Sequence, residues 1–256
     1  MLLEQKQINI AKAFKQIGVL PNDTVMIHGD AGVAAQLTHL DPNQRIQNFI
    51  KEIIEYFSVN GTVLVPTFTY SFTTNKNFDV SNTPAEIGTF SESFRKNPLV
   101  RRSKHPIFSV AGAGKHFKKF EKARNDDCFG EGTVFDLLYK LNGKIICLGC
   151  DFDRVTFAHY VEQHFGVPYR YMKSFSGLVV NEGKKTELTT SYYVRKLSMN
   201  RISDLSFLKK ELINRGELSM SEFGRFSVLA TKTKDFFNCS ISLLKNNKYA
   251  LTKNEI

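Results

Sequence analysis

The chain has 256 residues, of which 42% are hydrophobic, so it is long enough to bury a substantial core in one large domain or two small ones. It contains no apolar run of transmembrane length, and Glu4 and Lys6 stand where a signal peptide needs its apolar core. Its cysteines follow no disulfide framework. We therefore expect a cytoplasmic protein without a membrane partner.

The charge balance is strongly basic. There are 35 Lys and Arg residues against 25 Asp and Glu residues, which gives a formal net charge of +10 and an isoelectric point near 9.4. Such an excess can serve solubility alone, or it can attract nucleic acid, a membrane surface or a phosphorylated small molecule. It argues against a polycationic substrate, which a positive surface would repel.

Apolar spacing along the chain alternates between the helical and the strand pattern. The segments expected to be helical are 4–18, 43–57, 131–141 and 205–213. The segments expected to be buried strands are 25–28, 62–66, 107–111, 144–149 and 225–231. Residues 177–180 and 186–194 resemble a hairpin, residues 70–87 form a long polar loop, and the polar tail 246–256 is expected to fray. This alternation predicts an α/β fold with helices on both faces of a mixed sheet and, since no linker or repeat interrupts it, a single domain over residues 1–256.

Two short motifs resemble cofactor sites but lack residues that such sites need. Gly112-Ala113-Gly114-Lys115 has neither the full glycine spacing of a phosphate-binding loop nor that of a dinucleotide fingerprint. Cys147 and Cys150 form a C-x-x-C pair in an apolar strand, without the second pair that zinc requires. We interpret the two cysteines as core packing, with an acylated Cys150 as the alternative.

The segment from Arg101 to Arg124 carries eight cations and one acid, Glu121. A solvated face is the usual explanation for such a run. Here the cations flank a predicted strand and a glycine-rich turn whose backbone N–H groups suit phosphate, so we favour phosphate binding. Phe108, Phe117 and Phe120 lie between the charges and would also suit single-stranded nucleic acid, although core packing explains them more simply.

His159 and Glu162 are the predicted catalytic pair. They are three residues apart, which places them on one face of a helix, and they follow the end of an apolar strand, where catalytic groups collect in α/β sheets. His164 is not at zinc-ligand spacing from His159, so we expect no metal. His28 also ends a strand, and its role as a cap or core residue or as a ligand contact is left open.

Taken in order, several segments resemble the aminoglycoside 3-N-acetyltransferase family over about residues 20–180. These segments are His28 with its turn, Gly61-Thr62-Val63-Leu64-Val65-Pro66-Thr67-Phe68, Arg102-Ser103-x-His105-Pro106-x-x-Ser109, Phe129-Gly130-x-Gly132-Thr133 and Thr156-x-x-His159-x-x-Glu162. The resemblance implies a three-layer α/β/α fold and transfer of acetyl from acetyl-CoA to a sugar amine. It implies that His159 is the general base and that Glu162 supports it.

The resemblance also implies where the two substrates bind. The residues expected to face coenzyme A are His28, Gly29, Asp30, Ala31, Arg102, Ser103, His105 and Ser109. The residues expected to face the amino sugar are Thr67, Tyr70 and Asp151. The family's turn after the histidine is usually rich in Ser with a following Arg, whereas this chain has Gly29, Asp30 and Gly32, so its cofactor contacts differ there.

Charge decides the expected acceptor. Family members that modify drugs hold a polycation, whereas this chain is strongly basic. We therefore expect a nucleotide-linked amino sugar, such as a dTDP-3-amino-3,6-dideoxyhexose for surface polysaccharide (lipopolysaccharide) synthesis. The alternative is an aminoglycoside, which carboxylates in the pocket would indicate, and the non-enzymatic alternative is a nucleic-acid-binding module. For the enzyme we expect no nucleic-acid partner, and a homodimer is left open.

Overall fold

The computed structural model describes residues 9–57 and 59–255. Its main sheet has seven strands, and the three central ones are parallel while those on either side are antiparallel. In spatial order they are β10 (Leu218–Phe223), β11 (Phe226–Lys232), β6 (Lys144–Leu148), β1 (Thr24–Gly29), β2 (Thr62–Pro66), β5 (Val110–Gly114) and β4 (Arg101–Arg102). The predicted mixed sheet is confirmed.

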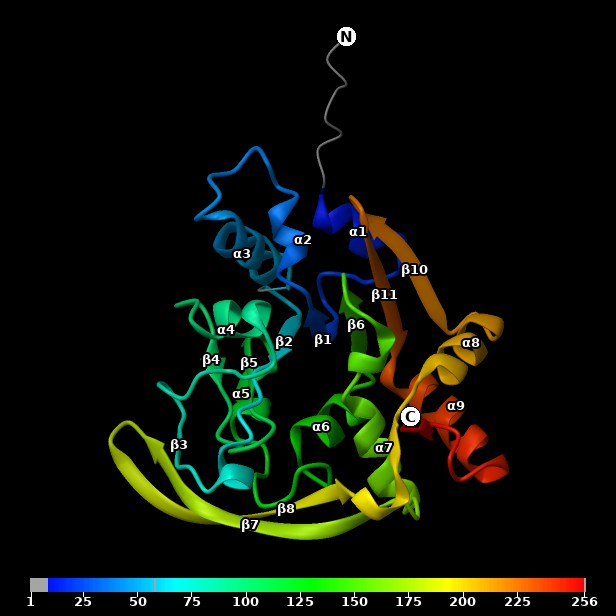
Figure 1. Cartoon of the computed structure of the whole chain (residues 1–256). Coiled ribbons are helices and arrows are strands. Elements are labelled where there is room, and N and C mark those ends of the chain that lie inside the picture. The colour runs from blue at the N-terminus through cyan, green and yellow to red at the C-terminus, as the bar shows by residue number, and fades with distance from the viewer. Residues whose placement is uncertain (1–8, 58, 256) are drawn as a thin grey trace.

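Alternate residues of the central strands face two separate apolar cores. In β1, Val25 and Ile27 enter one core and Met26 enters the other, as the period of two in a strand requires. The first core is covered by α1 (Ile10–Gln16), α2 (Gly32–Ala35), α3 (Arg45–Phe57) and α4 (Thr89–Arg95). The second is covered by α5 (Phe117–Glu121), α6 (Val134–Lys140), α7 (Phe157–Phe165), α8 (Ser206–Asn214) and α9 (Thr233–Asn246). Helices α3 and α6 therefore lie on opposite sides of the sheet, which confirms the three-layer α/β/α fold (Figure 1).

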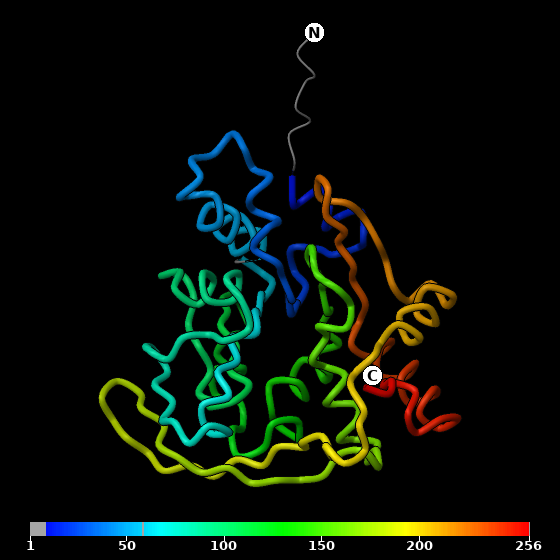
Figure 2. Tube along the Cα trace, in the orientation of Figure 1, coloured from blue at the N-terminus to red at the C-terminus, as the bar shows by residue number. Residues whose placement is uncertain are grey.

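A long curved hairpin forms a second sheet. Its strands are β7 (Arg170–Asn181) and β8 (Lys184–Arg195), and the short β3 (Phe78–Asp79) pairs with β7. The hairpin runs along one side of the molecule below α6 and α7 (Figures 1 and 2). Both strands are longer than the predicted segments 177–180 and 186–194. The additional residues were missed because many of them are exposed and polar and so show no apolar pattern.

The tail 246–256 was expected to fray, and over its described residues this expectation is wrong. β12 (Thr252–Asn254) pairs with β9 (Arg201–Ser203), and Leu251 is fully buried. Figure 2 shows this red C-terminal segment beside the yellow segment that carries β9. Three turns of 3-10 helix complete the described elements: η1 (Ser71–Thr74), η2 (Phe152–Arg154) and η3 (Leu197–Met199).

Two predicted boundaries move for identifiable reasons. The strand expected at 107–111 begins only at Val110, because the amides of Ile107 and Phe108 donate to Nδ1 of His105 and so form a turn. The helix expected over 4–18 is α1, which begins at Ile10 after Asn9 accepts a hydrogen bond from the amide of Lys12. Residues 4–8 of that prediction lie outside the described residues.

Every helix in the described part of the chain is too short or too polar to cross a lipid bilayer.

Candidate active site

His159 and Glu162 form a hydrogen-bonded pair on α7. Nδ1 of His159 is 2.6 Å from Oε2 of Glu162, whose side chain is 1% exposed. An ionised carboxylate only accepts, so it fixes the proton on Nδ1 and leaves the lone pair on Nε2. Nε2 has no hydrogen-bond partner within the described ranges, and 20% of the imidazole side chain is exposed. The pair is therefore arranged to accept a proton from outside the protein.

Tyr169, in the turn after α7, and Arg170, the first residue of β7, hold the Glu162 carboxylate. The hydroxyl of Tyr169 donates to Oε1 at 2.9 Å. Nε of Arg170 lies 2.7 Å from Oε2 but is not aligned to donate a hydrogen bond. Its Nη2 lies 3.0 Å from Nδ1 of His159, and the shorter contact of 2.6 Å with the carboxylate favours the proton on Nδ1. Neither residue was singled out from the sequence, because they lie beyond the Gly166 turn and no local pattern marks them.

The neighbouring charges set the protonation of the pair. Burial and the charge of Arg170 lower the pKa of His159 below its ordinary 6.5, although Glu162 acts in the opposite direction. Burial raises the pKa of Glu162, but His159 and Arg170 outweigh it and leave that pKa below 4.5. At neutral pH the imidazole is thus neutral and the carboxylate is charged, which is the state a general base requires.

A pocket of about 900 Å³ opens at the carboxyl ends of β1, β2 and β6, where open α/β sheets bind ligands. Six of the predicted site residues line it: His28, Gly29, Asp30, Ala31, Tyr70 and Asp151. Thr156, which precedes α7, also lines the pocket, and His159 is one helical turn further along the same helix face. Thr156 therefore connects the pocket to α7, while His159 and Glu162 are not among the residues that line it.

Aromatic rings connect the pocket to the imidazole. The ring of Tyr70 lies 5.9 Å from that of Phe108, which lies 4.8 Å from Phe129, and Phe129 meets His159 edge-on at 5.8 Å. Tyr70 adopts a left-handed backbone conformation with φ of 51°, a costly state for a tyrosine and one that clusters at functional sites. Phe108 and Phe129 are buried core residues, so the ring contacts pass through the core between Tyr70 and His159.

His28 provides an unpartnered polar atom in this pocket. Its side chain is 7% exposed, and Nε2 is buried without a hydrogen-bond partner. Burial lowers its pKa to about 4, so the ring is neutral at physiological pH. A buried nitrogen without a partner is costly, and a bound ligand would satisfy it. Beside it, the thiol of Cys150 donates to the His28 carbonyl, while Cys147 is packed in the core.

The remaining predicted residues lie behind the pocket wall. Thr67, Arg102, Ser103, His105 and Ser109 are all buried. All three nitrogens of the Arg102 guanidinium donate to protein oxygens, among them the Thr67 carbonyl and the Ser109 hydroxyl. Ser103 accepts from the amide of Val110, and Nδ1 of His105 accepts from two backbone amides. This placement favours support of the loop after β2 over direct contact with a ligand.

The pocket is locally acidic in a basic protein. Three carboxylates line it, from Asp30, Asp151 and Asp153, against the cations Arg154 and Arg225. The sequence did not predict Asp153 or Arg225 as site residues. Arg225 reaches the pocket from the turn between β10 and β11, which is far from the other site residues in the chain. The overall excess of positive charge is therefore not a property of this pocket.

An imidazole held by a buried carboxylate, near a pocket at the strand ends of an α/β sheet, is typical of enzymes that transfer groups. The family model described as aminoglycoside 3-N-acetyltransferase matches residues 34–245. The aminoglycoside N(3')-acetyltransferase-like protein YokD, SPbeta prophage-derived, of Bacillus subtilis (strain 168) is 24% identical over 200 residues, 69% of this chain and 71% of the relative. Aminoglycoside N(3)-acetyltransferase IV of Salmonella sp is 23% identical over 175 residues, 66% of this chain and 63% of the relative. The structure of AAC-IIIb with CoASH has a TM-score of 0.77 at 17% identity, over 93% of this chain and 95% of that one.

The chain belongs to the aminoglycoside 3-N-acetyltransferase family. It is an acyltransferase whose cosubstrate is acetyl-CoA. The expectation of a nucleotide-linked amino sugar for lipopolysaccharide synthesis is wrong, because the matching family and both relatives are named for aminoglycosides. The physical error was to assign the net charge of the whole chain to a pocket that carries three carboxylates.

Proposed function

We propose that this protein transfers acetyl from acetyl-CoA to an amine of an aminoglycoside. The observation that carries the proposal is the neutral His159 imidazole, oriented by Glu162, next to a pocket with three carboxylates. Aminoglycosides are polycations, and the carboxylates of Asp30, Asp151 and Asp153 supply the opposite charge. The names of the family and of the two relatives support the same acceptor.

His159 performs the proton transfer in this proposal. Its Nε2 accepts a proton from the attacking amine while Nδ1 stays hydrogen-bonded to Glu162. As the imidazole becomes cationic, the Glu162 carboxylate stabilises it, and Arg170 and Tyr169 keep that carboxylate in place. A positioned base of this kind accelerates such reactions by about 10²–10⁴-fold.

The acetyl donor fits the other side of the pocket. Acetyl-CoA supplies the thioester that the amine attacks. The unpartnered Nε2 of His28 and the backbone from Gly29 to Ala31 offer it hydrogen-bonding groups at the end of β1. Arg154 and Arg225 line the same pocket and would face the anionic part of the coenzyme.

The test is the release of free thiol from acetyl-CoA with a panel of aminoglycosides, followed by mass spectrometry and NMR of the product. We expect turnover that depends on the aminoglycoside and a product acetylated on the 3-amino group. Thiol release that is the same with and without every aminoglycoside would refute the proposed acceptor. Acetylation of another amine would keep the acceptor and refute the position.

A further inference from the structure

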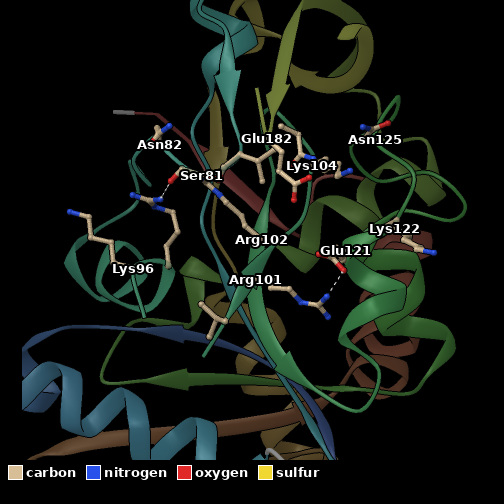
Figure 3. Close-up of a pocket in the computed structure, with 15 residues that line it drawn as sticks. Ser81, Asn82, Lys96, Arg101, Arg102, Lys104, Glu121, Lys122, Asn125 and Glu182 are labelled. Atoms are coloured by element: carbon tan, nitrogen blue, oxygen red, sulfur yellow. Dashed lines mark hydrogen bonds and ion pairs between the residues drawn. The ribbon is translucent and has the colours of Figure 1, made fainter. Parts of the chain in front are cut away.

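A second pocket, of about 1010 Å³, lies on the outer side of strand β4. Its lining comes from the loop after β3, the end of α4, β4 itself, the end of α5 and the tip of the β7–β8 hairpin. None of its lining residues belongs to the active-site pocket. Figure 3 shows Lys96 on one side of the opening and Lys122 and Asn125 on the other, with Arg102 between them.

Cations dominate this second pocket. Six of them line it, against two carboxylates: the cations are Arg95, Lys96, Arg101, Arg102, Lys104 and Lys122, and the carboxylates are Glu121 and Glu182. Protein groups hold four of these cations, among them Arg102, whose guanidinium nitrogens all donate to protein oxygens. Arg101 lies 3.2 Å from Glu121, and Arg95 and Lys96 share the single carboxylate of Glu92.

Two lysines keep their charge uncompensated. Lys104 and Lys122 are exposed at the pocket, and neither has an acidic partner within hydrogen-bond or ion-pair distance in residues 9–57 and 59–255. Ser81, Asn82 and Asn125 add neutral hydrogen-bonding groups to the lining. These charges line a cavity of ligand size, whereas a charged face that only keeps a protein soluble needs no cavity.

We propose that this pocket binds a small molecule carrying two or more phosphate groups. Phosphate oxygens accept the charge-assisted hydrogen bonds that Lys and Arg donate, and cations on opposite sides of the opening suit a ligand with more than one phosphate. The lining contains no aromatic side chain on which a base could stack, so phosphate rather than a nucleobase is recognised. The inference does not depend on the proposed acetyl transfer.

The experiment measures binding of inorganic tripolyphosphate by titration calorimetry at low and at physiological salt. The variant is the double substitution Lys104→Met and Lys122→Met, which removes both charges and keeps the side-chain length. Its matched control is Lys118→Met with Lys119→Met, an equal loss of charge at exposed positions of α5 outside the pocket lining. We expect the first variant to bind about a hundredfold more weakly, about tenfold for each lost charge-assisted bond. We expect the control to bind as the unmodified protein does.

Three results would overturn the proposal. The first is an equal loss of affinity in both double variants, which would show that the ligand senses only net charge. The second is competition between tripolyphosphate and acetyl-CoA, which would place the anion in the coenzyme site. The third is tighter binding of a single-stranded oligonucleotide than of tripolyphosphate at physiological salt, which would identify a nucleic-acid surface instead. Acetyl transfer by the Lys104 and Lys122 variant should stay at the level of the control.

Discussion

Replacement of Glu162 by Gln separates the catalytic role of this carboxylate from its structural role. The carboxylate is 1% exposed and lies against the side chain of Arg170, which is 6% exposed. Gln removes the anion and leaves a buried guanidinium without a counter-charge, at a cost of about 3–5 kcal/mol in the free energy of unfolding. Gln also fails to hold the proton on Nδ1 of His159, so we expect kcat to fall by about 10²–10⁴-fold.

Two further variants make this prediction specific. Adding Arg170→Met to Glu162→Gln removes the stranded cation, so urea unfolding should show recovery of most of the lost stability while kcat stays low. Tyr169→Phe removes one hydrogen bond to the same carboxylate, which costs about 1.5–3 kcal/mol and leaves kcat within about tenfold. The reasoning is refuted if Glu162→Gln keeps kcat within about threefold of the unmodified enzyme, or if its stability falls no further than that of Tyr169→Phe.

Three more predictions follow from the titrating and acidic groups. Because His159 must be neutral and its pKa lies below 6.5, protonation of the imidazole should lower kcat/KM in buffer more acidic than that pKa; a rise in acid would contradict the base assignment. Burial lowers the pKa of His28 and that of His105 to about 4, so the folded protein disfavours protonation of both rings. Their contribution to stability is full above pH 6.5 and is lost as the pH falls toward 4, by about 3 kcal/mol for each ring, and an unchanged urea midpoint between pH 7 and pH 5 would disprove it. Asp151→Asn should raise KM for an aminoglycoside and leave KM for acetyl-CoA unchanged, and equal effects on both constants would remove Asp151 from the acceptor side.

The sequence predicts the central sheet and the catalytic pair because both are local. Apolar runs such as 62–66 and 144–149 are strands in the structure, and three-residue spacing does place His159 and Glu162 on one helix face. The helix α9 and the strand pairing of the tail escaped prediction. The strand pairing depends on a contact between distant segments, β12 with β9, which no local pattern records. Helix α9 does carry apolar residues at helical spacing, such as Phe236, Leu243 and Leu244, and its prediction was missed.

The predicted site residues fall into two groups in the structure, those that line the pocket and those buried away from it. Sequence motifs do not distinguish a side chain that lines a pocket from one that supports it, as Arg102 illustrates with its buried hydrogen bonds. Tyr169, Arg170 and Arg225 join the site only through tertiary structure. Net charge was misleading for the same reason, because the fold separates the acidic active-site pocket from the basic pocket at β4.

The most direct test of the account compares the unmodified enzyme with His159→Gln in acetyl transfer to an aminoglycoside. Gln cannot accept a proton at neutral pH, so we expect kcat to fall by about 10²–10⁴-fold while acetyl-CoA binding, measured by calorimetry, stays unchanged. Near-normal turnover by His159→Gln would contradict the claim that this imidazole is the general base.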